Sequence, residues 1–106
     1  MSKFKITQHK GFHMAFENGF RISVQFGPGN YCEKRDADFD APKKEMNWES
    51  CSAEIAVFGK KGMLGIGSSD TVAGWLSTDQ VAKVIAIVSS SKTENKMIKK
   101  CKALNL

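Results

Sequence analysis

The sequence predicts an α+β fold: an antiparallel sheet of four to six strands, covered on one face by one C-terminal helix. Apolar and polar residues alternate through residues 11–26, as in strands with one buried face. Apolar residues then recur at helical spacing through residues 81–88. A chain of 106 residues can build one core. We expect one domain over residues 1–91, followed by a lysine-rich tail or short second helix over residues 92–106.

The alternating stretch predicts two strands, residues 12–16 and 20–26, joined as a hairpin. The Asn-Gly pair between them suggests a two-residue turn, but that turn would place the two apolar rows on opposite faces. A three-residue loop over residues 17–19 pairs Phe16 with Phe20 and keeps all the large apolar residues together. We therefore predict the longer loop, with Gly19 in a left-handed conformation that suits a residue without a β-carbon.

Further strands are expected at residues 3–7, 53–58 and 71–77. The first would be an edge strand with Phe4 and Ile6 facing the core. The stretch between the hairpin and residue 51 shows no sustained period, so we expect a long connection there.

A helix is predicted over residues 78–90. Ser77 and Gln80 form a capping box, the reciprocal arrangement in which each side chain bonds the other's backbone. The apolar stripe of this helix consists of Val81, Val84, Ile85 and Val88. A second amphipathic helix would begin at Thr93, with Ile98 and Cys101 on its apolar side.

The net charge of +5 is concentrated at the C-terminus. Residues 92–106 hold five lysines and one glutamate, which leaves eleven basic and ten acidic groups for residues 1–91. Nucleic-acid binding is therefore expected only through the tail, unless its lysines are a solvated face. The sequence contains no apolar run near the ~20 residues of a membrane span, so we expect no membrane partner. The basic start "MSKFKITQHK" is not followed by the apolar region of a secretory signal, so we expect a cytoplasmic protein with reduced cysteines.

The polar row of the hairpin is the first candidate ligand-binding surface. It carries His13, Arg21, Ser23 and Gln25. A histidine titrates near neutral pH, and an arginine forms paired hydrogen bonds with a phosphate or carboxylate. The alternative is that these residues are the wet face of an ordinary antiparallel sheet.

The turn after the hairpin is a second candidate surface. Its backbone amides near Gly29 would suit an anion, with Asn30 and Tyr31 as neighbouring contacts and Trp48 as an aromatic from the long connection. A type II turn with Pro28 at its second position accounts for the same residues structurally.

Metal and cofactor sites are not expected. The acidic segment at residues 36–40 fails as a calcium loop, because Ala41 and Asn47 replace the required glycine and glutamate. The cysteines and histidines lack zinc-like spacing. Cys32 as a nucleophile would need a nearby base such as His13, and a buried, inert thiol is the simpler interpretation.

Three segments resemble one family: "GFHMAFENGFRISVQFGPGNYC" from residue 11, "AEIAVF" from residue 53 and "GWLSTDQVAKVIAIV" from residue 74. The chain is similar to a family of small uncharacterised proteins of tailed bacteriophages, and "SVQFGPGNYC" is the most specific element. The resemblance implies a phage-encoded protein that acts in the host cell cytoplasm, and it supplies no catalytic residues to carry over to this chain. By analogy, small phage proteins of this kind often block host factors or defence systems, frequently by binding and not by catalysis.

The leading hypothesis is a non-enzymatic protein that counters or modulates a host function. In one version it sequesters a small anionic nucleotide signal between protomers; in another it binds a host protein through its sheet edge or the loop around Trp48. The sequence does not determine the oligomeric state, but an exposed sheet edge is compatible with a homo-dimer or higher oligomer. The alternative is a phosphodiesterase-like hydrolase with His13 as acid or base and Arg21 on the phosphate.

Overall fold

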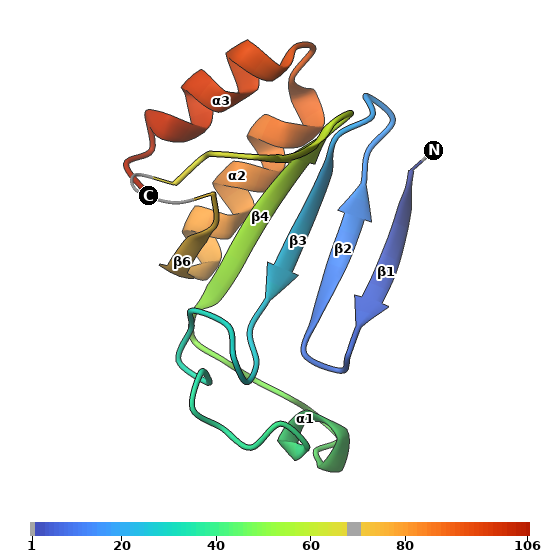
Figure 1. Cartoon of the computed structure of the whole chain (residues 1–106), viewed down its shortest axis with the longest axis vertical. Helices are drawn as coiled ribbons and strands as arrows, with labels where there is room; N and C mark the ends of the chain where they lie inside the picture. Colours follow the sequence, from blue (N-terminus) through green and yellow to red (C-terminus); the bar gives the residue numbers. More distant parts are fainter. Residues whose placement is uncertain (1, 68–70) are drawn as a thin grey trace.

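Strands from both halves of the chain join in one antiparallel sheet, followed by two C-terminal helices (Figure 1). The computed structural model describes residues 2–67 and 71–106. Its strands are β1 (Lys3–Thr7), β2 (Gly11–Ala15), β3 (Arg21–Gln25), β4 (Ala53–Gly59), β5 (Gly62–Leu64) and β6 (Ala73–Leu76). Its helices are α1 (Ala41–Lys44), α2 (Thr78–Ser90) and α3 (Glu94–Lys102). The α+β prediction is confirmed, with six strands in the described sheet.

The β2–β3 hairpin has the predicted three-residue loop. The Phe16 amide donates to the Phe20 carbonyl at 2.9 Å, and Met14 lies opposite Ile22. Gly19 has a φ of +92°, the left-handed conformation that the loop requires. The apolar rows of both strands therefore share one face.

The core lies between that face and α2. This helix packs on β3 and β4 and buries Val81, Val84 and Val88. The predicted capping box is present: the Gln80 amide donates to the Ser77 hydroxyl, and the Ser77 amide donates to the Gln80 side chain. The predicted helix over residues 78–90 is confirmed.

The second C-terminal helix, α3, packs beside α2. Its Met97 and Cys101 side chains are fully buried and belong to the same core as α2. Burial raises the pKa of the Cys101 thiol to about 11.

Strand β1 forms the predicted edge, but the predicted inward placement of Phe4 and Ile6 is wrong. Their side chains are 80% and 81% exposed. They lie opposite Met14 and Phe12 and so share the apolar face. However, α2 covers β3 and β4, and Figure 1 shows β1 on the side of the sheet farthest from both helices.

The long connection between β3 and β4 folds below the sheet in Figure 1 and contains α1. The Trp48 indole N–H donates to the Phe26 carbonyl at 2.9 Å, which ties the connection to the end of the hairpin. None of the described helices is both long and apolar enough to cross a bilayer.

Candidate functional site

The face of the sheet opposite α2 carries polar and charged side chains, and we call it the open face. Directly opposed residues of antiparallel strands point to the same side, so the strand register defines its rows. One row runs from Lys5 of β1 through His13 of β2 to Ser23 of β3 and Ala56 of β4. The neighbouring row runs from Lys3 through Ala15 and Arg21 to Phe58.

Four basic side chains gather where these rows cross β1, β2 and β3. We call Lys3, Lys5, His13 and Arg21 the basic cluster. Together with Met14 and Ala15 they line a hollow of about 90 Å³. Ala15 lies between Lys3 and Arg21, and its small side chain leaves that space open.

The basic cluster has no neutralising carboxylate. Within residues 2–67 and 71–106 the only ion pair is Arg35–Asp36, outside the cluster. Burial lowers the pKa of His13, and the nearby charges of Lys5 and Arg21 lower it further. This lowered pKa favours the neutral imidazole of His13, which lies among the side chains of Lys3, Lys5 and Arg21.

Arg21 is oriented by an aromatic neighbour. Its guanidinium lies 4.8 Å from the centre of the Phe58 ring, a cation–π contact across β3 and β4. Arg21 is nevertheless exposed, so a ligand in solvent can reach it.

Ser23 and Gln25 are part of the same face but bond to their neighbours. The Gln25 amide donates to the Thr7 hydroxyl at 2.7 Å and to the Ser23 hydroxyl at 3.1 Å. Ser23 is buried, at 7% exposure. Ser23 and Gln25 therefore lie beside the basic cluster on the open face, bonded to each other.

The turn at Gly29 is not brought to the basic cluster. The Asn30 amide donates to the Gly27 carbonyl at 3.1 Å and Gly29 has a φ of +83°, which matches the predicted type II turn. The Gly29 amide donates to Arg35, and both the Asn30 side chain and the Tyr31 amide donate to Glu54. These donors have partners within the chain and are not free for an anion.

Trp48 is also remote from the basic cluster. Its indole N–H is bonded to Phe26, and its ring receives Lys34 at 5.6 Å. It therefore anchors the long connection to the end of the hairpin.

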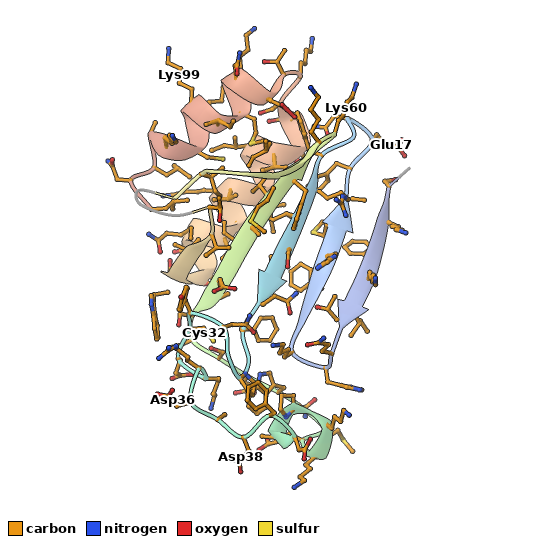
Figure 2. The ribbon with its side chains drawn as sticks, in the orientation of Figure 1. Glu17, Cys32, Asp36, Asp38, Lys60 and Lys99 are labelled. Carbon is orange, nitrogen blue, oxygen red and sulfur yellow. The ribbon has the colours of Figure 1, made fainter. Side chains whose placement is uncertain are left out.

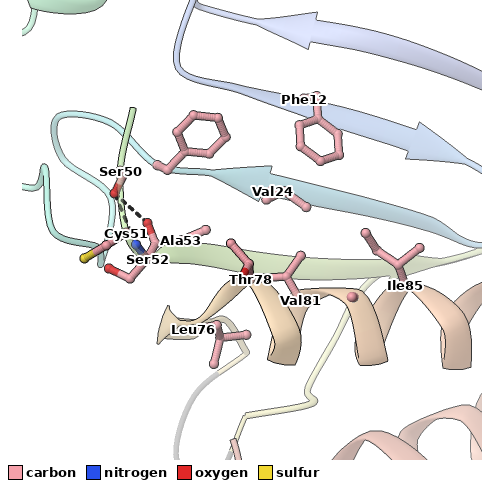
Figure 3. Close-up of a pocket in the computed structure, with 12 residues that line it drawn as sticks. Phe12, Val24, Ser50, Cys51, Ser52, Ala53, Leu76, Thr78, Val81 and Ile85 are labelled. Carbon is pink, nitrogen blue, oxygen red and sulfur yellow. Dashed lines mark hydrogen bonds between the residues drawn. The ribbon is translucent and has the colours of Figure 1, made fainter. Parts of the chain in front are cut away.

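An apolar groove of about 320 Å³ lies on the other face, between α2 and strands β2 and β3. Figure 3 shows Phe12 and Val24 reaching it from the sheet, and Val81 and Ile85 from the helix. At its end the Ser50 hydroxyl donates to the Ser52 carbonyl at 2.7 Å. The sequence reasoning missed this groove, because it depends on how far α2 extends over the sheet.

The three cysteines are free thiols, and none of them belongs to the basic cluster. Cys32 and Cys101 are buried and Cys51 is exposed. Glu33 beside Cys51 raises the pKa of that thiol. In the described part of the chain, no three His, Cys, Asp or Glu side chains are grouped to hold a metal ion.

Sequence reasoning also missed Lys3 and Lys5 as members of the candidate site. The signal that could have found them is the alternation in "KFKIT", because a strand with Phe4 and Ile6 on one face must present both lysines on the other.

Comparison of the chain with protein-family models, with curated proteins and with solved structures gave no match. The resemblance to a bacteriophage family therefore stays a prediction.

Proposed function

We propose that this protein is a non-enzymatic binding protein that holds a small anionic ligand on its open face. The ligand class is a phosphate-bearing molecule such as a nucleotide, bound by Lys3, Lys5, His13 and Arg21. The observation that carries the proposal is the basic cluster itself, in which these side chains surround one hollow without a carboxylate.

The chemistry of the cluster suits a phosphate. A guanidinium donates paired hydrogen bonds to phosphate oxygens, and ammonium groups add compact positive charge. Like charges held close together repel, and an anion removes that repulsion as it binds. A dianionic phosphate is therefore a better ligand than a neutral sugar or base alone.

Binding fits the cluster better than hydrolysis does. A phosphodiesterase using His13 as a general base would need an acceptor such as a carboxylate to orient the imidazole. The charged residues that act on His13 are Lys5 and Arg21, and both are cationic. They favour holding a phosphate without turnover.

The biological role belongs to the same proposal. If the resemblance to bacteriophage proteins is correct, the ligand is an anionic nucleotide signal of the host cell and sequestration removes it from its receptor. Binding to a host protein remains the alternative role, with the sheet edge as the contact.

Isothermal titration of the full chain tests the proposal. The ligands are inorganic tripolyphosphate and a panel of linear and cyclic nucleotides, titrated into the wild type, Arg21→Ala and Lys60→Ala. We expect binding by the wild type and at least a tenfold loss of affinity in Arg21→Ala, equivalent to about 1.4 kcal/mol. Lys60 lines a separate basic hollow beside α3, so Lys60→Ala removes an equal charge and should bind normally.

Two outcomes would reject the proposal. One is the absence of heat with every ligand from folded wild-type protein. The other is an equal loss in both variants, which would indicate only a general charge effect. Recovery of a hydrolysed nucleotide, with hydrolysis abolished in His13→Ala, would replace binding by the phosphodiesterase alternative.

A further inference from the structure

The outer edge of β1 has backbone groups that pair with no other described strand. Two hydrogen bonds between β2 and β3 set the alternation in β2: the Phe16 amide donates to the Phe20 carbonyl, and the Phe26 amide donates to the Lys10 carbonyl. Antiparallel strands alternate the direction of their hydrogen-bonding groups, so Gly11, His13 and Ala15 turn theirs toward β1. In β1 the groups that face β2 belong to Lys3, Lys5 and Thr7. Those of Phe4 and Ile6 face outward.

The same two residues carry the exposed apolar side chains of the edge. Phe4 and Ile6 are 80% and 81% exposed, because α2 packs over β3 and β4 and does not reach the β1 end of the apolar face. An edge strand with free backbone groups and large apolar side chains is a template for another strand.

We propose that this edge pairs with β1 of a second copy of the chain, around a two-fold axis, and that the pairing completes the anion site. In the antiparallel register that matches apolar side chains, Phe4 lies opposite Ile6 of the second copy. The outward backbone groups of both residues then bond across the axis. Phe4 of each copy then covers Ile6 of the other. Within one copy the same two side chains already lie opposite Met14 and Phe12.

This register brings Lys5 of the two copies face to face on the open face. Directly opposed like charges destabilise a strand pair, and lysines on an edge strand normally discourage such pairing. The unliganded dimer is therefore weak. An anion bound between the two Lys5 side chains removes the repulsion, so ligand binding and dimerisation stabilise one another.

The second copy supplies what a single basic cluster lacks. In one chain Lys5 and His13 are neighbours, and the cluster is open on the β1 side. In the dimer the row continues as His13, Lys5, Lys5 and His13, which spans about 14 Å at the strand spacing of about 4.8 Å. A ligand with two or more phosphate groups fits this row better than a monophosphate. This inference rests on the proposed function for its ligand, but not for the strand pairing.

Sedimentation velocity of the full chain, with and without tripolyphosphate, tests the pairing. A reducing agent prevents a disulfide through the exposed Cys51. We expect a weak dimer whose dissociation constant falls at least tenfold with tripolyphosphate. Ile6→Lys should be monomeric under both conditions. Phe39→Lys places the same charge at a side chain of similar exposure, 79%, in the long connection outside β1, and should behave as the wild type. Lys5→Thr should dimerise more tightly without the anion and lose the response to it.

The outcomes separate this inference from the proposed function. A wild type that stays monomeric with the anion, or an Ile6→Lys variant that stays dimeric, would overturn the strand pairing. If monomeric Ile6→Lys binds tripolyphosphate as tightly as the wild type, the shared site is overturned and the proposed function stands. If the wild type dimerises through β1 but binds no anion, both the shared site and the proposed function fail, and only the strand pairing is left.

Discussion

His13 makes ligand binding on the open face sensitive to pH. In the free protein its pKa is lowered by burial and by the charges of Lys5 and Arg21. A bound anion next to the imidazole favours the protonated form, so the complex holds more protons than the free protein. Affinity must therefore rise as the pH falls.

We predict that the dissociation constant for a cyclic dinucleotide falls several-fold between about pH 7.5 and pH 5.5, the range around the ordinary imidazole pKa of about 6.5. The phosphodiester groups of this ligand stay ionised throughout, so the dependence reports on the protein. His13→Gln retains a polar side chain that does not titrate, and its affinity should be constant. Titrations at a series of pH values measure both proteins; an equal pH dependence in His13→Gln would exclude His13 as the source.

The sequence predicted that His13 and Arg21 lie on the same face of the sheet, and the strand register confirms this. It did not predict that Gln25 bonds to Thr7 and Ser23, because those contacts depend on β1 lying beside β2. Nor could the sequence predict that the Gly29 amide donates to the Arg35 carbonyl, because this contact lies inside a connection that has no repeating pattern of apolar residues.

Among the elements, the tip of the β2–β3 hairpin holds the C-terminal end of α2. The Asn18 side-chain amide donates to the carbonyls of Val88 at 2.7 Å and Ser91 at 2.9 Å. The last carbonyls of a helix have no partner within it, and Asn18 supplies one. Its carbonyl oxygen accepts from the Phe20 amide, which fixes the loop at the same time.

We predict that Asn18→Asp lowers the free energy of unfolding by about 2 kcal/mol, because it removes the donor and sets a negative charge at the negative end of a helix. Urea denaturation measures the change. Asn47→Asp makes the same substitution at an exposed site in the long connection and should stay within about 0.5 kcal/mol of the wild type. Equal stability of Asn18→Asp and the wild type would show that this contact does not hold the helix.

Most of the elements could be predicted because their signals are local. Alternation and the loop argument gave the hairpin, and the capping box with an apolar stripe gave α2. The error at Phe4 and Ile6 has another origin. Alternation shows which residues share a face. Whether a helix covers that face depends on the path of the chain after β6. Figure 1 shows α2 over β3 and β4, away from β1.

For the whole molecule, charge is distributed unevenly over the surface. Figure 2 shows Lys60 and Lys99 at one end and Asp36 and Asp38 at the other. The lysines of α3 gave the sequence its basic end, and nucleic-acid binding through them stays a prediction. Because Met97 and Cys101 of α3 are buried in the core, deleting residues 92–106 would expose that core. Substituting the exposed Lys99 and Lys100 is the sounder test of that idea.

We propose that an anion binds at the basic cluster and not at the more numerous lysines near α3. Lys3 and Lys5 come together with His13 and Arg21 only because three strands pair in one register. The rival hollow of about 350 Å³ is lined by Lys60, Lys61 and Lys92 but also contains Glu94. An acidic group inside a basic hollow weakens its attraction for anions.

The most direct test is a titration of ¹⁵N-labelled protein with tripolyphosphate, followed by the chemical shifts of its backbone amides. We expect the largest changes in β1, β2 and the start of β3, centred on Lys5, His13 and Arg21. Changes centred on Lys60, Lys61 and Lys92, or no changes in a folded protein, would contradict it.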